Sequence, residues 1–453
     1  MEEHWGRVNM ESMLERKPLH PAERQAPPAR VCVTGAAGFI GSRVVARLLA
    51  CGHSVHATRR AAGDDAAVAA ALDALPGAAE RLRWFQADLL QEGSFDAAVA
   101  GCKYVIHCAG VVSLSVSQRQ GFARVVEPTV KGVEHLLQAI NQTPSVEKVV
   151  LTSSLAAVSS HFSDRGEGHV YSEADWNLDV LRTSQPYFMA KVAAEWHAWA
   201  LAAQQDRWRL VTICPGNVYG PLMANSPACG PVPSMKKMMD GTVWPFIAPL
   251  GLTAIDLDDV AAAHVLAMVM PEAHGRYVLC ERSALMTEVA GWLRELYPRH
   301  WVPSISLPFW LAVMTSSLLP SDANFPPPAL PRSFFWIKVL WNKLAAIDSS
   351  KAQRELGLRF IPFKQTLKDF MDSLISHGIL PRMPEYSAHP AALPLPTGGA
   401  GHATELAGAT ATVTAKLAEV KEVAAEVAAE AKEAVHGSGG EGVRTRGQLR
   451  KLR

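Results

Sequence analysis

Two short motifs in this sequence carry residue types that could do chemistry together. Gly35, Gly38 and Gly41 are spaced three residues apart in an otherwise mostly apolar run. Much later in the chain, Tyr187 and Lys191 lie four residues apart, about one turn of a helix. A glycine-rich turn can hold a dinucleotide, and a tyrosine beside a lysine can deliver a proton. In this order, the two motifs indicate an oxidoreductase that uses a nicotinamide cofactor.

The surroundings of the glycine motif favour a nucleotide site. An apolar strand is expected over 31–34 and a helix over 39–50, so the glycines fall in the turn between them. In a dinucleotide fingerprint, Gly35 would allow the tight turn, Gly38 the approach of the pyrophosphate, and Gly41 close packing of the helix on the sheet. The backbone amides of Phe39 and Ile40, the first residues of the helix, are expected to face the phosphates.

The end of the second strand predicts which nicotinamide cofactor binds. This strand, expected over 54–58, is followed by Arg59 and Arg60, and no acidic residue occurs before Asp64. An acid at this point binds the ribose 2′-hydroxyl of NAD, whereas an arginine accommodates the 2′-phosphate of NADP. We therefore expect NADP(H) to be preferred over NAD(H), with Arg60 as the phosphate ligand.

Further cofactor contacts are expected where the third and fourth strands end. The positions expected near the adenine are Asp88 and Leu89, and those expected near the nicotinamide are Cys108, Ala109 and Gly110.

Catalysis is assigned to Ser154, Tyr187 and Lys191. A cation beside a phenol favours the phenolate, so Lys191 would activate Tyr187 as the proton donor and also hold the nicotinamide ribose. Ser154 follows an expected strand over 148–153 and would donate a hydrogen bond to the oxygen of a carbonyl substrate. Ser153 is the alternative donor, and we expect it to face the cofactor.

Strands and helices alternate along most of the chain, which predicts an α/β fold with a doubly wound parallel sheet of the Rossmann type. Besides the elements named above, strands are expected over 82–87, 104–108 and 210–214, and helices over 125–140, 190–204, 256–270, 286–296 and 349–356. The expected regions are a flexible N-terminal tail over 1–29, a dinucleotide-binding domain over 30–214, an interleaved substrate-binding region over 215–385 and a low-complexity, disordered tail over 386–453.

The tail contains an alanine-rich segment, 411–436, that predicts a helix. Its small apolar residues follow a weak coiled-coil spacing, but alanine buries little area. We interpret it as a solvated single helix, and contact with a protein partner is the alternative.

Composition excludes several functional classes. The net charge of +1 on 453 residues offers no basic field for nucleic acid. The seven cysteines are scattered and form no Cys-x-x-Cys pair, which argues against a disulfide scaffold or a metal site and suits a reducing, cytoplasmic compartment. The acidic N-terminus is unlike a secretory signal, and the longest apolar stretch, 309–319, is too short to span a membrane.

Several segments together resemble the extended short-chain dehydrogenases/reductases, closest to the dihydroflavonol 4-reductase and cinnamoyl-CoA reductase group. The resemblance covers residues 30 to about 380, and its main segments are 34–42, 87–89, 105–109, 152–154, 187–195, 215–221, 256–264, 275–278 and 348–357. It implies a Rossmann fold, an NAD(P)-dependent reductase and, in addition to the contacts above, cofactor contacts at Pro215 and Val218.

The chain departs from this group at three places. The segment 183–188 lacks the block that cinnamoyl-CoA reductases carry at the catalytic tyrosine. Ser159 stands where flavonoid reductases usually have asparagine, and Thr129 stands where some extended members have a catalytic asparagine. The resemblance therefore leaves the substrate open.

The sequence favours reduction of a ketone or aldehyde on an apolar or aromatic small molecule. A 3β-hydroxysteroid-dehydrogenase-like or a nucleotide-sugar epimerase activity is the alternative, and a non-catalytic nucleotide-binding scaffold is the alternative of another class. The apolar stretches 308–319 and 333–341 are expected to cover the substrate pocket. Peripheral contact with a membrane is the other interpretation of these stretches.

Overall fold

The computed structural model describes residues 10–60, 65–111, 118–160, 165–166, 168–178, 180, 185–226, 230–316 and 340–381. The tail predicted over 386–453, with its expected helix, lies outside these residues.

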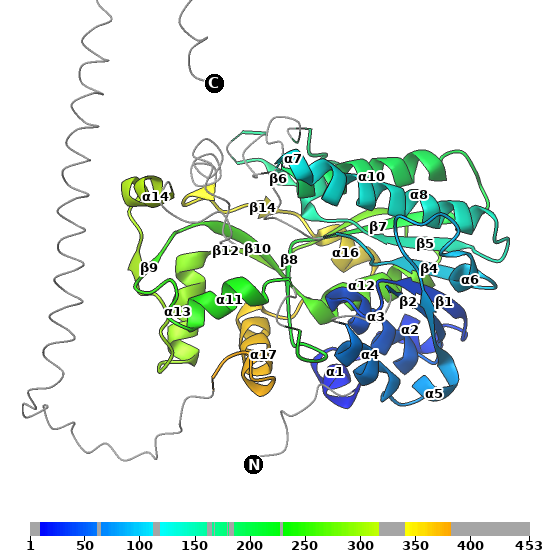
Figure 1. Ribbon diagram of the computed structural model, residues 1–453, viewed down its shortest axis with the longest axis horizontal. Coiled ribbons are helices and arrows are strands. Elements are labelled where there is room, and N and C mark those ends of the chain that lie inside the picture. The colour runs from blue at the N-terminus through cyan, green and yellow to red at the C-terminus, as the bar shows by residue number, and fades with distance from the viewer. Residues whose placement is uncertain are drawn as a thin grey trace, which may run out of the picture. The chain divides into compact units, whose positions relative to one another are not determined.

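A seven-stranded parallel sheet forms the centre of the described chain (Figure 1). Its strands are β1 (Arg30–Thr34), β2 (Ser54–Arg59), β3 (Leu82–Gln86), β4 (Tyr104–His107), β5 (Lys148–Thr152), β7 (Arg209–Pro215) and β11 (Gly275–Leu279). They lie in the order β11-β7-β5-β4-β1-β2-β3. The order reverses between β1 and β4, and in such sheets ligands bind beyond the carboxyl ends of the strands at this reversal. The predicted doubly wound fold is confirmed.

Helices cover both faces of this sheet. Figure 1 shows α8 (Glu127–Asn141) and α10 (Pro186–Ala202) on one face, and α3 (Phe39–Ala50) and α12 (Leu257–Val269) on the other. Successive residues of β1 point to opposite faces. Val31 and Val33 therefore pack in the core that contains α3 and α12, while Cys32 packs in the core that contains α8 and α10.

The remaining helical elements are shorter or lie outside the two main layers. They are α4 (Ala66–Asp73), α5 (Ala78–Arg81), α6 (Asp96–Val99), α7 (Gln118–Gly121), the π-helical turn η1 (Phe122–Val126), the 3-10 turn η2 (Leu155–Ala157), α11 (Val232–Met239), α13 (Met286–Leu296), α14 (Phe309–Ser316), α16 (Ser350–Glu355) and α17 (Phe363–Ser376).

The chain also forms a smaller, three-stranded sheet, and two of its strands directly follow strands of the central sheet. Only Gly216 separates β7 from β8 (Asn217–Tyr219), and β12 (Arg282–Leu285) follows β11 after two residues. Both strands pair with β10 (Gly251–Asp256), β8 in parallel and β12 antiparallel. Helices α11, α13 and α17 close a separate apolar core over this sheet. Two further pairs of short strands are β9 (Phe246–Ile247) with β13 (Ile305–Ser306), and β6 (Val170–Tyr171) with β14 (Ala346–Ile347).

The predicted N-terminal tail is wrong for residues 10–25. Two helices, α1 (Met10–Arg16) and α2 (Pro21–Gln25), pack against the dinucleotide-binding part of the fold. Glu23 of α2 is fully buried and receives two hydrogen bonds from Arg47 of α3, at 2.5 and 2.6 Å. The polar sequence of residues 10–25 predicted exposure to solvent. Its charged side chains instead pair with buried side chains of opposite charge. Residues 1–9 lie outside the described residues.

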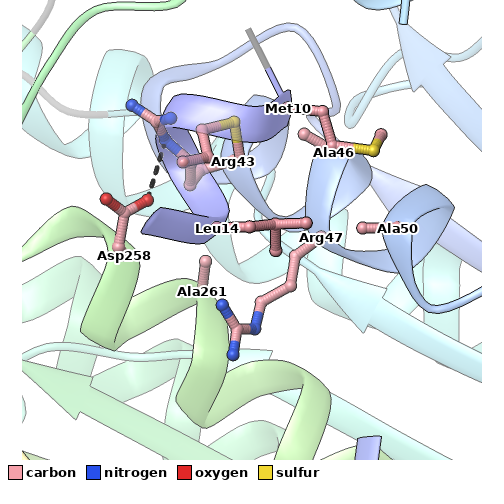
Figure 2. A pocket seen from close by; sticks show the side chains of 9 residues that line it. Met10, Leu14, Arg43, Ala46, Arg47, Ala50, Asp258 and Ala261 are labelled. Atoms are coloured by element: carbon pink, nitrogen blue, oxygen red, sulfur yellow. Dashed lines mark ion pairs between the residues drawn. The ribbon is translucent and has the colours of Figure 1, made fainter. Parts of the chain in front are cut away.

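Charged groups also connect α1 to α12 and α17. Arg16 pairs with Asp256 at the start of α12, at 2.7 Å, and with Asp369 of α17, at 3.2 Å. Beside it, Arg43 of α3 pairs with Asp258 at 3.2 Å (Figure 2). The cavity between α1, α3 and α12 is lined by apolar side chains together with Arg43, Arg47 and Asp258, and it has no room for a water molecule. We therefore interpret it as a structural joint rather than a ligand site.

We predict that Glu23→Ala lowers the free energy of unfolding by about 3–5 kcal/mol, because it leaves the buried Arg47 guanidinium without its counter-charge. Urea denaturation measures this loss. The matched control is Glu295→Ala, which removes an exposed partner of Lys364, and it should change stability little. If Glu23→Ala changed the free energy of unfolding as little as the control does, α2 would not be packed against α3 in solution.

Candidate active site

The glycine motif forms a turn that admits no side chains. Gly35 has a φ of +64°, and a Cβ there would lie 2.8 Å from the backbone of Ala109 at the end of β4. A Cβ on Gly41 would lie 2.1 Å from the carbonyl oxygen of Gly35. Gly38 is exposed and precedes α3 without any side-chain cap. The turn therefore leaves the N-terminus of α3, with Phe39 and Ile40, open to an anion.

A buried hydrogen-bond chain fixes this turn to β4. The Thr34 hydroxyl accepts the N–H of Ala109 at 3.2 Å and lies 2.6 Å from His107 Nδ1. The short distance joins the hydroxyl to the imidazole by a hydrogen bond. Burial, with a smaller effect of the Lys191 charge, lowers the pKa of His107 to about 3. His107 therefore stays uncharged and holds the ends of β1 and β4 together.

The two arginines that end β2 have different surroundings. The Arg59 guanidinium lies over the ring of Trp84 on the neighbouring strand, 5.1 Å from its centroid. Arg60 is exposed. Of the two, Arg60 is thus the one available to a bound phosphate.

The positions expected near the adenine follow β3. Asp88 is exposed, and its carboxylate accepts the N–H of Leu90 at 2.8 Å. Leu89 is half-buried, packs beside Gly132 of α8, and its carbonyl lies 3.0 Å from His135 Nδ1. These contacts fix the loop that lies beyond the carboxyl end of β3.

Lys191 lies among the strand ends at the centre of the sheet. Its Nζ donates to the carbonyl of Thr152 at 3.1 Å and would lie 3.8 Å from a Cβ on Gly110. Tyr187, one turn earlier on α10, is half-buried, and its ring meets that of Phe188 edge to face. The structure thus brings the Tyr-Lys motif to the strand ends that also carry the glycine turn.

A second neutral histidine lies beneath these strand ends. The Thr152 hydroxyl lies 2.8 Å from His264 Nε2 and 3.4 Å from Cys108 Sγ. His264 Nδ1 lies 2.7 Å from the carbonyl of Val260, which makes Nδ1 the donor and Nε2 the acceptor. Burial lowers the pKa of His264 to about 4 and raises that of Cys108 to about 11. Both groups therefore stay uncharged at neutral pH.

Ser154 begins the turn η2, which packs against α10. Its oxygen accepts the N–H of Ala156 at 3.1 Å, so its own proton remains to be donated. The buried side chain of Asn177 donates to the carbonyl of Ala156 at 2.7 Å and holds the turn in place. This geometry suits a donor to a carbonyl oxygen.

Ser153 instead points into a buried polar network. Its hydroxyl donates to Glu195 at 2.5 Å, and Thr212 of β7 donates to the same carboxylate at 2.8 Å. Arg276 of β11 completes the set with hydrogen bonds of 2.8 and 3.2 Å to the two carboxylate oxygens. The Ser153 hydroxyl donates its proton to Glu195, and the expectation that Ser153 faces the cofactor stays a prediction.

Arg276 extends this network toward the loops beyond the sheet. Its guanidinium donates to the carbonyls of Glu173 and Asp175, at 3.1 and 2.5 Å, and lies 3.9 Å from the ring centroid of Trp176. Glu195 lies on α10 one turn after Lys191, so one ion pair connects the catalytic helix, three strands and this loop.

The remaining expected positions have structural partners. Pro215 pairs with Leu279 of β11 and Val218 with Ile255 of β10. The Thr129 hydroxyl donates to the carbonyl of Val125 in its own helix at 2.6 Å, which leaves it no proton for a relay. Ser159 is fully buried.

Sequence reasoning assigned no role to Glu195, Arg276, His107 or His264. The spacing of Glu195 from Lys191, four residues, could have placed it on the same helical face. The other three residues lie in or beside apolar strands and helices, where no local pattern shows what they contact. Among the described residues, no cluster of His, Cys, Asp and Glu could hold a metal ion. Within the same residues, no helix is long and apolar enough to cross a membrane.

Comparison with known proteins agrees with this architecture. Residues 31–280 match the NAD dependent epimerase/dehydratase family. Cinnamoyl-CoA reductase CAD2 of Medicago truncatula is 34% identical over 76% of this chain and 95% of its own length. Dihydroflavonol 4-reductase of Gerbera hybrida is 34% identical over 61% of this chain and 75% of its own. The structure of Gre2 from Candida albicans, in complex with NADPH, superposes with a TM-score of 0.62 at 25% identity over 77% of this chain and 99% of that one.

The chain belongs to the NAD dependent epimerase/dehydratase family, as the matched residues and the relatives show. It is an NAD(P)-dependent oxidoreductase that acts on CH–OH or carbonyl groups.

The buried neutral histidine predicts a pH effect on stability. An unfolded histidine titrates near pH 6.5, whereas folded His107 resists protonation down to about 3. The contribution of neutral His107 to the free energy of unfolding is therefore present above pH 6.5 and is lost as the pH falls below it. Between pH 7.5 and 5.5, the stability advantage of the wild type over His107→Gln should narrow by about 1.4 kcal/mol. Urea denaturation at both pH values tests this, and a constant gap would contradict it.

Proposed function

We propose that this protein reduces a ketone or aldehyde on an apolar or aromatic small molecule with NADPH, and that Tyr187 donates the proton. The observation that carries the proposal is the position of Lys191, which is held between Gly110 after β4 and the carbonyl of Thr152 at the end of β5, one helical turn after Tyr187. NADPH, when bound, supplies the hydride that reaches the carbonyl carbon. Tyr187 gives its phenolic proton to the carbonyl oxygen, and Ser154 donates a hydrogen bond to the same oxygen.

The residues present fit a dinucleotide. The turn at Gly35 has no space for a Cβ, and the N-terminus of α3 lacks a side-chain cap, so backbone amides are available to a pyrophosphate. The exposed Arg60 supports binding of a 2′-phosphate, because its fork of donors suits a phosphate dianion. Lys191 would hold the nicotinamide ribose.

Two observations support the substrate class. The similar plant enzymes are named for dihydroflavonol and cinnamoyl-CoA, which both contain an aromatic ring. A nucleotide sugar would need cations for its pyrophosphate, and the segment 215–250 offers only Lys236 and Lys237. Lys236 already pairs with Asp240 at 2.7 Å. Reduction of an apolar carbonyl is therefore favoured over epimerisation of a nucleotide sugar.

A reducing compartment such as the cytoplasm suits this proposal. The cysteines at 32, 51, 102, 108, 214 and 280 are all free thiols, as is usual for proteins of that compartment.

The catalytic assignment predicts a graded loss of activity. Tyr187→Phe keeps the ring but removes the proton, so turnover should fall by about 10²–10⁴-fold while NADPH affinity changes little. Lys191→Ala should reduce both quantities, and Ser154→Ala should reduce turnover by a smaller factor. The measurement is NADPH oxidation with a panel of aromatic, steroid and short-chain carbonyls, followed by kcat and cofactor affinity for each variant.

Tyr104→Phe is the matched control, because this tyrosine begins β4 at the opposite end of the sheet, and it should keep wild-type turnover. If Tyr187→Phe keeps more than about a tenth of the turnover, Tyr187 is not the proton donor.

The cofactor assignment predicts that NADPH binds more tightly than NADH and that Arg60→Asp narrows or reverses this preference. The introduced carboxylate would repel a 2′-phosphate and accept a hydrogen bond from a 2′-hydroxyl. Titration of both cofactors against the wild type and the variant measures this. Arg83→Asp, at an exposed position of β3, is the control. Equal affinities in the wild type would refute the assignment.

A further inference from the structure

An exposed aromatic surface contains none of the residues assigned to cofactor binding or catalysis. We call it the Trp surface. Its members are large apolar side chains that are 39–59% exposed to solvent, namely Trp244, Phe246, Trp301, Ile305, Trp310 and Leu344. Three of the six are tryptophans. A protein that stays in water rarely exposes a contiguous apolar patch of this kind without a function for it.

The Trp surface is continuous in space although its residues come from three segments of the chain. Phe246 pairs with Ile305 between β9 and β13. The ring of Trp244 meets the ring of Trp301 edge to face, at 5.6 Å between centroids. A bridge between Leu250 and Trp341 brings in the segment that carries Leu344. Figure 1 shows β9 and α14 at one end of the fold, away from α3 and α12.

The third segment also contacts the helix that carries Trp310. The ring of Trp341 lies against that of Phe309, the first residue of α14, at 5.2 Å between centroids. The side chains of the Trp surface are thus mounted on a hydrogen-bonded and packed framework rather than on separate loops.

Charge distinguishes this surface from the rest of the molecule. The segments that form it, 241–255, 297–316 and 340–347, contain no aspartate or glutamate, although the chain has 43 acidic residues. They contain Arg299 and Lys343, and Lys343 is exposed. The nearest acid, Asp240, bridges to Trp301 but is paired with Lys236 at 2.7 Å. The charges that the three segments themselves contribute are therefore cations, and an apolar surface with such cations complements an anionic lipid leaflet. A second copy of the chain would instead bring like charges together.

The residue types of the Trp surface also favour a membrane interface. Tryptophan combines a large apolar body with one N–H donor, and it is enriched where membrane meets water. Side chains of this kind insert to the depth of the lipid headgroups.

We propose that the Trp surface binds the interface of a bilayer that contains anionic phospholipid, so that the enzyme lies on the membrane without crossing it. The tryptophan side chains supply apolar burial, and Lys343 supplies attraction to the headgroups. This proposal does not depend on the catalytic assignment.

The test is flotation of the full chain with vesicles of phosphatidylcholine alone and with added phosphatidylserine. The wild type should float with the anionic vesicles. The double variant Trp301→Ser/Trp310→Ser should lose about tenfold or more in partitioning, because apolar burial is removed. Lys343→Glu should weaken binding about fivefold on anionic vesicles only. High salt should reduce wild-type binding without abolishing it.

The matched control is Trp196→Ser, which removes another half-exposed tryptophan from α10, outside the Trp surface, and it should bind as the wild type does. Far-UV spectra and urea denaturation check that each variant folds. The proposal is overturned if the wild type binds neither kind of vesicle or if Trp196→Ser loses as much as the double variant. The proposal is also overturned if the wild type is a dimer in solution and the double variant is a monomer, because a second copy of the chain would then cover this surface.

Discussion

The buried ion pair between Glu195 and Arg276 holds the candidate site together. Glu195 lies on the helix that carries Tyr187 and Lys191, and its carboxylate also accepts the hydroxyl of Ser153, the residue before Ser154. Burying two charges costs free energy unless every donor and acceptor is used. Here the two strand hydroxyls and the loop carbonyls around the pair meet that condition. The same pair therefore fixes Tyr187, the proposed proton donor, and Ser154, the proposed carbonyl-binding hydroxyl, relative to each other.

A second constraint comes from the way the chain enters the smaller sheet. The link after β7 is a single glycine, and a Cβ on this Gly216 would lie 2.9 Å from the hydroxyl of Thr253 in β10. The link after β11 is only two residues long, so the region expected to bind substrate is attached directly to two strands of the central sheet. Arg16 adds a further connection, because it contacts acidic groups on both α12 and α17. The N-terminal helix thus fastens α12 of the central layer to α17 of the smaller part.

Local sequence patterns predicted the central fold well and the long-range polar contacts poorly. The helices over 39–50 and 286–296 have the expected bounds, and that over 190–204 begins earlier, at Pro186, because proline is compatible with the first turn of a helix. The strands of the smaller sheet and α17 were not expected, since they are short or follow glycine- and proline-rich stretches. The partners of Glu195 and of α1 lie 81 and about 240 residues away, a separation that no periodicity reveals.

The central claim is that one edge of the sheet holds NADP(H) with its nicotinamide beside Tyr187 and Lys191. A crystal structure with NADP⁺ tests this most directly. The account predicts the pyrophosphate at the N-terminus of α3, the 2′-phosphate on Arg60, and the nicotinamide ribose hydrogen-bonded to Lys191 Nζ. A dinucleotide bound with its nicotinamide away from Tyr187, or no dinucleotide along this edge at saturating concentration, would contradict it.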